Sequence, residues 1–201
     1  MKKLLFVFIT LIYSTFTFAS QTPAQELSDK LKQIQTIQAD FKQVIYNMNN
    51  HVIGENHGTM IMVRPNKFYW QVISPISRLI VANGKTFWIY NQSLKQVIVR
   101  AQDQNAEMTP ALLLSSNATD LTRAFHVSLQ EGRYVLQAHS DKTLFQMIAL
   151  KFSGNAISQI EMQDNLGQRG KLQFSSIKIN KPVSKRLFVF AVPRGVDVIR
   201  Q

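Results

Sequence analysis

The sequence predicts a mainly β protein of the α+β class, with one helix followed by a single antiparallel sheet. Apolar and polar residues alternate with a period of two from residue 37 almost to the C-terminus, which is the periodicity of strands buried on one face. Short turn-forming pairs such as Asn83-Gly84 and Glu131-Gly132 separate these segments. Connections this short join antiparallel neighbours, so we expect a meander and not a βαβ arrangement.

The first element is an amphipathic helix over residues 25–36. Leu27, Leu31 and Ile34 recur at helical spacing and share one face, and Thr22 with Pro23 can begin the helix as its N-cap and first residue. The period then changes to two, which predicts a first strand over residues 37–46.

The same alternation predicts the remaining strands, each bounded by turn-forming residues. They are expected at residues 57–64, 67–73, 78–83, 86–91, 95–101, 126–131, 133–139, 145–152, 156–163, 170–179 and 187–192.

Residues 103–125 interrupt this series. Thr109 and Pro110 have the character of an N-cap and a first helical residue, and residues 111–114 form a short apolar turn after them. A second short helix is expected from residue 119 to residue 125. Two helices of this size are too small to form a domain, so we expect them to pack on the sheet or to cover it.

The N-terminus has the pattern of a secretory signal peptide. Lys2 and Lys3 precede an apolar run over residues 4–13, and small residues follow at Ala19 and Ser20. A membrane anchor is the alternative, but the apolar run is shorter than the about 20 residues that span a bilayer. We expect residues 1–19 to be removed and residues 20–201 to form one exported domain.

Cysteine content and charge narrow the class of protein. The chain has no cysteine, so it forms no disulfide and does not carry the lipid that a bacterial lipoprotein attaches to a cysteine. It has 23 basic and 12 acidic residues, a formal net charge of +11. The basic residues are spread along the chain without a long run, which favours a solvated basic surface over a dedicated polyanion site, and no nucleic-acid partner is expected.

The sequence contains few residues arranged for chemistry. Its four histidines lack metal-ligand spacing, and no nucleophile elbow, P-loop or dinucleotide fingerprint is present. We therefore predict no enzymatic activity, no metal and no cofactor. Apolar strand faces are abundant instead, and they fit either the core of a sandwich or the wall of a ligand cavity, for which flexible methionines such as Met60 and Met62 are suited.

Four motifs, in order along the chain, resemble one known family. A proline and an asparagine follow an arginine, then a phenylalanine and a tryptophan, at Arg64, Pro65, Asn66, Phe68 and Trp70. Further matches are Asn83 to Asn91 (NGKTFWIYN), Thr109 to Leu113 (TPALL) and Phe188 to Val196 (FVFAVPRGV). Together they cover essentially the whole chain after the signal peptide, which resembles the LolA family of periplasmic outer-membrane lipoprotein carriers.

The resemblance implies a fold and a function. The fold would be an antiparallel sheet of about 11 strands curled into an unclosed (half) barrel, with short helices forming a lid over a hydrophobic cavity. The function would be that of a periplasmic chaperone, acting as a monomer. It would receive acylated lipoproteins from an inner-membrane ABC transporter, hold their acyl chains in the cavity, and deliver them to an outer-membrane lipoprotein receptor.

The resemblance also assigns roles to residues. Arg64 would hold the lid closed by hydrogen bonds to backbone carbonyls, and the expected lid residues are Leu31, Leu112, Leu113, Leu114 and Ser115. From strand alternation we expect the acyl-chain cavity to be lined by Ile37, Phe41, Ile45, Met60, Met62, Phe68, Trp70 and Val72. Residues 111–117 (ALLLSSN) lack the bulky aromatic or charged residue that relatives often have there, so the lid contacts should differ in detail.

Three other functions remain open at this point. The family's receptor has a similar fold, but it is itself a lipoprotein and needs a cysteine that this chain lacks. A non-enzymatic periplasmic β module that binds other lipids or a protein partner is the second alternative. A periplasmic hydrolase is the third, although the sequence offers no candidate pair of catalytic residues.

Overall fold

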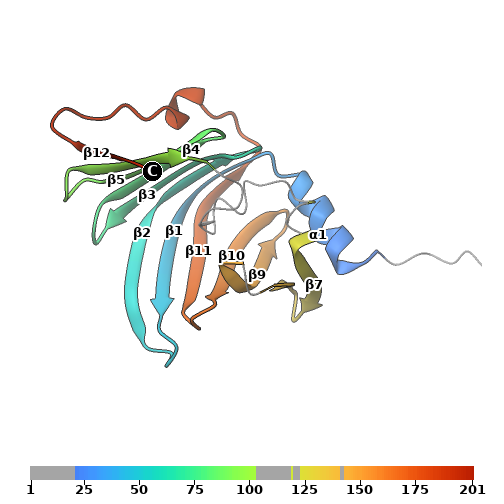
Figure 1. Ribbon diagram of the computed structural model, residues 1–201. Helices are drawn as coiled ribbons and strands as arrows, with labels where there is room; N and C mark the ends of the chain where they lie inside the picture. The colour runs from blue at the N-terminus through green and yellow to red at the C-terminus, as the bar shows by residue number, and fades with distance from the viewer. Residues whose placement is uncertain (1–20, 103–118, 120–122, 141–142) are drawn as a thin grey trace, which may run out of the picture.

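The computed structural model describes residues 21–102, 119, 123–140 and 143–201, and Figure 1 shows the fold. The helix α1 spans Pro23–Lys32 and a 3-10 helix, η1, spans Lys185–Phe188. The strands are β1 (Thr36–Tyr46), β2 (Val52–Val63), β3 (Lys67–Ser74), β4 (Arg78–Asn83), β5 (Thr86–Asn91), β6 (Gln96–Ala101), β7 (Phe125–Gln130), β8 (Arg133–Ala138), β9 (Phe145–Ser153), β10 (Ala156–Asp164), β11 (Arg169–Ile179) and β12 (Asp197–Arg200).

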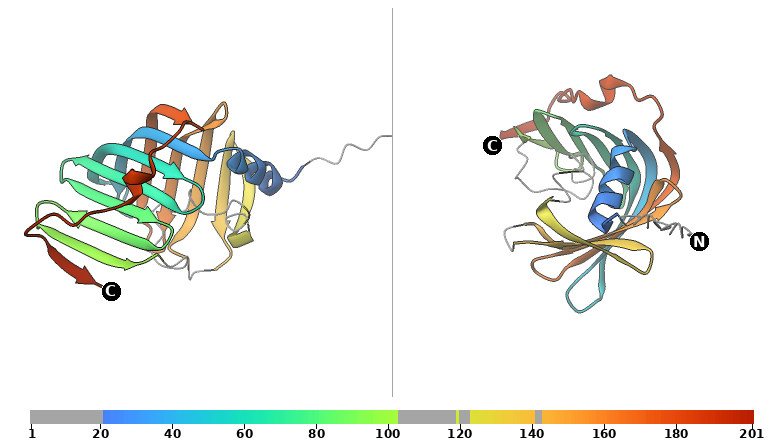
Figure 2. Two further views of the ribbon diagram at one scale, coloured as in Figure 1. Left: turned by 90° about the horizontal axis from the view of Figure 1, so that it is seen from above. Right: turned by 90° about the vertical axis from the view of Figure 1, so that its right-hand side faces the viewer.

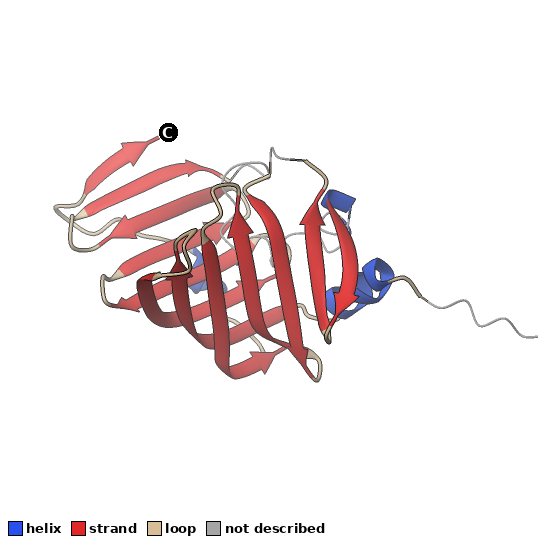
Figure 3. Ribbon diagram, turned by 90° about the horizontal axis from the view of Figure 1, so that it is seen from below, coloured by secondary structure: helices blue, strands red, loops and turns tan. Residues whose placement is uncertain are grey.

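These strands form one sheet of 12 strands, in the order β12-β6-β5-β4-β3-β2-β1-β11-β10-β9-β8-β7. The sheet curls around a concave face and its two edge strands, β12 and β7, do not pair with each other (Figure 2, right). The structure therefore confirms the predicted fold class, an antiparallel sheet curled into an unclosed barrel. Figure 3 shows the same strands from below.

The expectation of a simple meander is wrong in one respect. Two meanders, β1 to β6 and β7 to β11, meet where β1 pairs with β11, from Ile37 opposite Ile179 to Tyr46 opposite Arg169. Turn-forming residues predict only that strands adjacent in sequence pair with each other. The β1–β11 pair joins segments far apart in the chain, and it depends on how the two meanders pack.

Most predicted strands are confirmed, with shifts at their ends. The clearest shift is in β2, which begins at Val52 and not at residue 57. The strand expected at 187–192 is wrong, because the chain there forms η1 and then an irregular segment. This C-terminal segment ends in β12. The pairing of β12 with β6 is parallel, which is an exception to the antiparallel pattern. The expected helices at 103–125 fall mostly outside the described residues, of which Thr119, Arg123 and Ala124 are helical.

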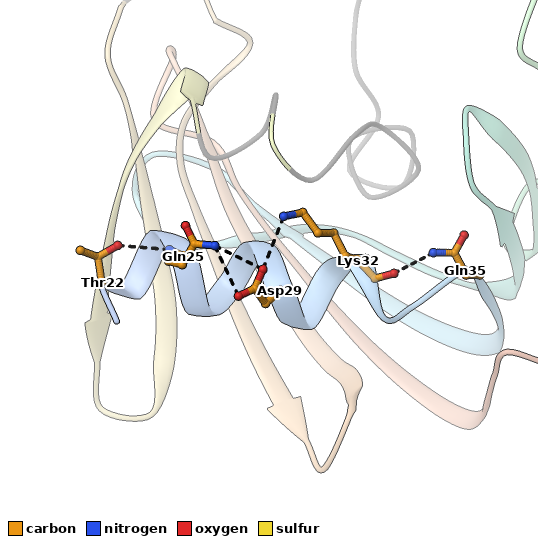
Figure 4. A network of polar contacts seen from close by, with 5 residues as sticks. All are labelled: Thr22, Gln25, Asp29, Lys32 and Gln35. Atoms are coloured by element: carbon orange, nitrogen blue, oxygen red, sulfur yellow. Dashed lines mark hydrogen bonds and ion pairs between the residues drawn. The ribbon is translucent and has the colours of Figure 1, made fainter. Parts of the chain in front are cut away.

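The helix α1 begins where the sequence predicts and ends earlier. The Thr22 hydroxyl caps it by accepting a hydrogen bond from the backbone N–H of Gln25 (3.3 Å). A line of polar contacts then follows its exposed side, from Gln25 through Asp29 to Lys32, and the Gln35 amide donates to the Lys32 carbonyl (Figure 4). The helix ends at Lys32 and not at residue 36. No helix among the described residues has the length and apolar character to cross a membrane.

The concave face carries the main hydrophobic core. Leu27 and Leu31 of α1 are fully buried against side chains from both meanders. At the centre the rings of Phe41 and Trp70 stack with their centroids 3.7 Å apart. This close approach occurs over Gly58, where a side chain would collide with the Phe41 ring and with the backbone of β3.

A second, smaller core lies on the opposite, outer face. Val81 and Val97, whose neighbours in sequence face inward, are buried here together with Phe188 of η1. The ring of Phe190 packs against Trp88 and Tyr90, with centroids 6.4 and 5.6 Å away. The C-terminal segment therefore crosses the outer face from β11 to β6 and covers apolar side chains that a half barrel would otherwise leave in water (Figure 1).

Candidate binding cavity

An open pocket of about 470 Å³ lies on the concave side, between β4 to β6 on one wall and β9 to β11 on the other. Its size is within the range typical of ligand sites. The lining residues are Gln43, Ile45, Arg78, Ile80, Phe87, Ile89, Arg100, Leu144, Phe145, Met162, Asp164, Gln168, Arg169 and Gly170. Half of them are large apolar side chains, so the pocket can hold an apolar ligand.

Strand alternation and cross-strand pairing place these side chains. Ile80 of β4 lies directly opposite Ile89 of β5, so both point to the same face. On the other wall Met162 lies opposite Gly170, and a side chain at Gly170 would come within 3.3 Å of the Met162 methyl group. The glycine thus leaves room beside Met162, and the wall stays open there.

The residues expected to line the cavity lie together, in two different environments. Ile45 lines the open pocket. The other seven belong to the buried core of the concave face, next to α1: Ile37, Phe41, Met60, Met62, Phe68, Trp70 and Val72. The structure thus brings all eight to the concave side. Their contact with acyl chains stays a prediction.

Most of the residues that line the pocket were not predicted from the sequence. Ile80, Phe87 and Ile89 show the same alternation as the residues that were selected, so this signal was sufficient to find them. Phe145 and Met162 are on the second meander. Their position facing β4 and β5 follows from the β1–β11 pairing, which local sequence does not reveal.

Arg64 connects the β2–β3 turn to the loop that joins α1 to β1. Its Nε–H donates a hydrogen bond to the carbonyl oxygen of Ile34 (2.9 Å), and its backbone N–H donates to the carbonyl oxygen of Gln35 (2.9 Å). Burial lowers the pKa of the guanidinium to about 10, so the group stays charged at neutral pH. Ile34 lies in the loop after α1, three residues beyond Leu31, the expected lid residue on the helix. Leu112, Leu113, Leu114 and Ser115 lie outside the described residues.

Asn180, which follows β11, holds the same loop from the other side. Its side-chain Oδ1 accepts a hydrogen bond from the backbone N–H of Gln35 (2.8 Å), and its Nδ2 donates to the carbonyl oxygen of Gln33 (2.8 Å). The loop after α1 is therefore held by Arg64 of the β2–β3 turn and by Asn180, which follows β11.

A third contact joins α1 to β8. Burial raises the pKa of the Tyr134 phenol, and a hydrogen bond with the Glu26 carboxylate raises it further. The phenol stays protonated at neutral pH and can donate to that carboxylate. Among the residues that the structure describes, no group of three or more histidine, aspartate or glutamate side chains is placed to hold a metal ion.

Comparison with known protein sequences supports one family. The family described as "Outer membrane lipoprotein carrier protein LolA" matches residues 32–191. An outer-membrane lipoprotein carrier protein of Legionella pneumophila (strain Paris) is 40% identical over 201 residues, which cover 98% of each chain. One from Coxiella burnetii (strain RSA 331 / Henzerling II) is 35% identical over 188 residues, covering 91% of this chain and 89% of the relative.

Solved structures show the same fold at low sequence identity. An uncharacterized conserved protein from Thermus thermophilus matches with a TM-score of 0.55 and 14% identity, over 89% of this chain and 99% of that one. A LolA superfamily protein from Nitrosomonas europaea matches with a TM-score of 0.51 and 14% identity, over 85% of this chain and 99% of that one.

Proposed function

The chain belongs to the LolA family of outer membrane lipoprotein carrier proteins, and we propose that it binds the acyl chains of lipoproteins in the concave pocket and carries them to the outer membrane. Members of this family are named as carriers and not as enzymes, which agrees with the sequence prediction. The observation that supports this use of the pocket is its apolar lining on the concave side of the sheet, where Leu27 and Leu31 of α1 are also buried.

The energetics of acyl binding explain why a carrier needs a competing contact. Each buried methylene contributes about 0.8 kcal/mol, so one long acyl chain contributes on the order of 10 kcal/mol. A cavity that only maximised burial would hold its cargo too tightly to release it. A lid that occupies the cavity when it is empty lowers the net affinity, because loading must displace it.

Arg64 is the residue that we propose holds this lid. In this interpretation the closed, empty state includes the hydrogen bond to Ile34, together with contacts made by Leu31 and by the expected lid residues 112–115. Loading would break or rearrange these contacts. A guanidinium suits the role because it offers several donors in a fixed planar fork, which the ammonium group of a lysine does not.

The proposed transport of lipoproteins between the two membranes requires two protein partners and a location in the periplasm. Lipoproteins would reach the carrier from an inner-membrane ABC transporter and leave it for an outer-membrane receptor, and the carrier would act in the periplasm as a monomer. We propose that residues 1–19 are removed on export. The mass of the protein recovered from a periplasmic fraction checks this, since retention of those residues would contradict it.

The function is tested by loading the protein with one purified lipoprotein. The carrier is mixed with the acylated protein and, in parallel, with the same protein lacking its acyl chains, and the complexes are separated by size. We expect a stable one-to-one complex with the acylated form alone. Equal binding of both forms would mean that the carrier recognises the polypeptide, and absence of binding to either would overturn the proposal.

A further inference from the structure

The apolar pocket has an excess of positive charge. Its lining contains Arg78, Arg100 and Arg169, and the single carboxylate of Asp164. That carboxylate is used within its own turn, where Oδ1 accepts hydrogen bonds from the backbone N–H groups of Leu166 (2.9 Å) and Gln168 (2.8 Å). Within the described part of the chain it forms no salt bridge with Arg78 or Arg169.

The arginines come from both walls of the pocket. Arg78 is exposed at the start of β4, and among the described residues it makes neither an ion pair nor a side-chain hydrogen bond. Arg169, at the start of β11, forms no salt bridge among those residues: its side chain donates to the Asn50 carboxamide and lies 5.8 Å from the centroid of the Tyr46 ring.

Arg100 adds a third cation to the lining. Its guanidinium carbon lies 4.9 Å from the centroid of the Phe87 ring, a cation–π contact inside the pocket. A cleft with apolar walls and an excess of one sign of charge concentrates its electric field, and this raises the local concentration of counter-ions.

An acyl chain in ester or amide linkage has no charge, so binding such chains does not explain these arginines. A ligand that matches both features has an apolar chain for Ile45, Ile80, Ile89 and Met162 and an anion for the guanidinium groups. Arginine forks bind phosphate and carboxylate oxygens through paired, charge-assisted hydrogen bonds.

We propose that this pocket binds an anionic amphiphile, an acyl chain that carries a phosphate or carboxylate group, with the chain along the apolar walls and the anion between Arg78 and Arg169. The inference rests on the proposed function only in placing acyl chains in the same pocket. It adds a class of ligand, a free anionic lipid, that competes with the lipoprotein or occupies the carrier between deliveries.

The first experiment compares ligands on the unmodified protein. Binding of lysophosphatidylglycerol, lysophosphatidylcholine and palmitate, all with the same acyl chain and below their aggregation concentrations, is measured by calorimetry at low and high salt. We expect the phosphate anion to bind about ten- to a hundredfold more tightly than the zwitterion, and salt to reduce this difference. Tight binding of palmitate but not of lysophosphatidylglycerol would identify a carboxylate as the anion. Equal affinity for all three would overturn the proposal.

The second experiment tests the residues. Arg78→Gln should lower the affinity for lysophosphatidylglycerol about tenfold and leave that for lysophosphatidylcholine unchanged, because one charge-assisted contact is lost. Arg194→Gln is the matched control, since it removes the same charge from an exposed site in the C-terminal segment outside the pocket. If both variants weaken anion binding equally, the preference comes from the net charge of the protein, and the pocket site is wrong.

A parallel assay separates this proposal from the proposed function. The unmodified protein and Arg194→Gln are also loaded with acylated lipoprotein, and this uptake measures the proposed function separately from anion binding. Lipoprotein uptake without a preference for the anionic lipid would refute the inference and keep the carrier function. A preference for the anionic lipid without lipoprotein uptake would support the inference and refute the carrier function.

Discussion

Arg64 shows how one side chain can join elements that are distant in sequence. It lies in the β2–β3 turn, and its two hydrogen bonds, one from the side chain and one from the backbone, reach the loop after α1. The group is partly buried and charged, so the hydrogen bonds it makes there are stronger than those of an exposed pair. Its removal should therefore affect the position of the helix end more than the stability of the sheet.

We expect Arg64→Leu to load lipoprotein as well as the unmodified protein, or better, and to pass it poorly to the receptor. A hydrogen bond from a charged group contributes about 1.5–3 kcal/mol, so losing it from the closed state should raise the net affinity for cargo about ten- to a hundredfold. The measurement loads both proteins with one lipoprotein, adds receptor and determines the fraction transferred.

The matched control for this variant is Arg194→Leu, which changes an exposed arginine outside the pocket and should transfer normally. Poor loading by Arg64→Leu, with normal transfer of whatever is bound, would show instead that Arg64 contacts the cargo or maintains the fold.

Among the described glycines, Gly58 is the one at which an added Cβ atom would come closest to other atoms. A Cβ atom there would lie 1.9 Å from the backbone oxygen of Gln71 and 2.8 Å from Cζ of Phe41, so β2 and β3 would have to separate. We expect Gly58→Ala to lower the free energy of unfolding by about 1–3 kcal/mol, measured by urea denaturation. Gly54→Ala is the control, because its Cβ would meet only Ile45, at 3.6 Å. Equal losses in both variants would mean that strand propensity, and not the collision, sets the cost.

At the scale of elements, the loop between α1 and β1 fixes where the helix lies. Asn180 makes two side-chain hydrogen bonds to this loop and has a positive φ of 55°, which asparagine tolerates better than most residues. The replacement Asn180→Gly keeps this backbone conformation accessible and removes only the side-chain bonds. It therefore isolates the effect of those bonds on the helix.

We expect Asn180→Gly to speed hydrogen exchange in residues 23–35 and to leave exchange in β8 and β9 unchanged. Loss of these two hydrogen bonds, and of a longer one from the Thr36 backbone N–H (3.4 Å), should lower the free energy of unfolding by about 1–3 kcal/mol. Asn155→Gly, in the exposed β9–β10 turn, is the control and should change neither quantity. Unchanged exchange over α1 in the Asn180 variant would show that Arg64 and the packing of Leu27 and Leu31 are sufficient to hold the helix.

At the scale of the whole molecule, one sheet supports two cores on its two faces. The inner core and the pocket share the concave face, whereas Phe188, Val81 and Val97 form the outer core beneath the C-terminal segment. Because the sheet lies between them, a change in the outer core should alter stability without altering the pocket.

Phe188→Ala should lower the free energy of unfolding by about 3–5 kcal/mol, because it leaves a cavity at a side chain that is only 3% exposed. Lipoprotein loading, measured at a temperature where the variant is folded, should equal that of the unmodified protein. Val189→Ala is the neighbouring control, since Val189 is 72% exposed and its truncation should cost little. A loading defect in the folded Phe188 variant would show that the C-terminal segment acts on the pocket through the sheet.

Local sequence patterns were sufficient to predict most of the helices and strands. The alternation of apolar residues located the strands, and the Thr22 cap and the spacing of Leu27 and Leu31 located α1, because these signals depend on residues a few positions apart. The same logic failed for residues 187–192. Phe188 and Phe190 pack on the outer face of the sheet from η1 and the irregular segment after it, so the prediction of a strand there is wrong.

The sequence alone determined the fold class, the family and which strand residues point to the concave face. Strand periodicity and the motifs around Arg64 depend only on short segments of the chain. Only the tertiary structure decided that β1 pairs with β11, and hence which residues face each other across the pocket. That pairing depends on the free energy of packing two meanders together, to which no single segment contributes enough to be recognised. The presence of Arg78 and Arg169 in the lining of one pocket is a consequence of this pairing, and sequence spacing gives no sign of it.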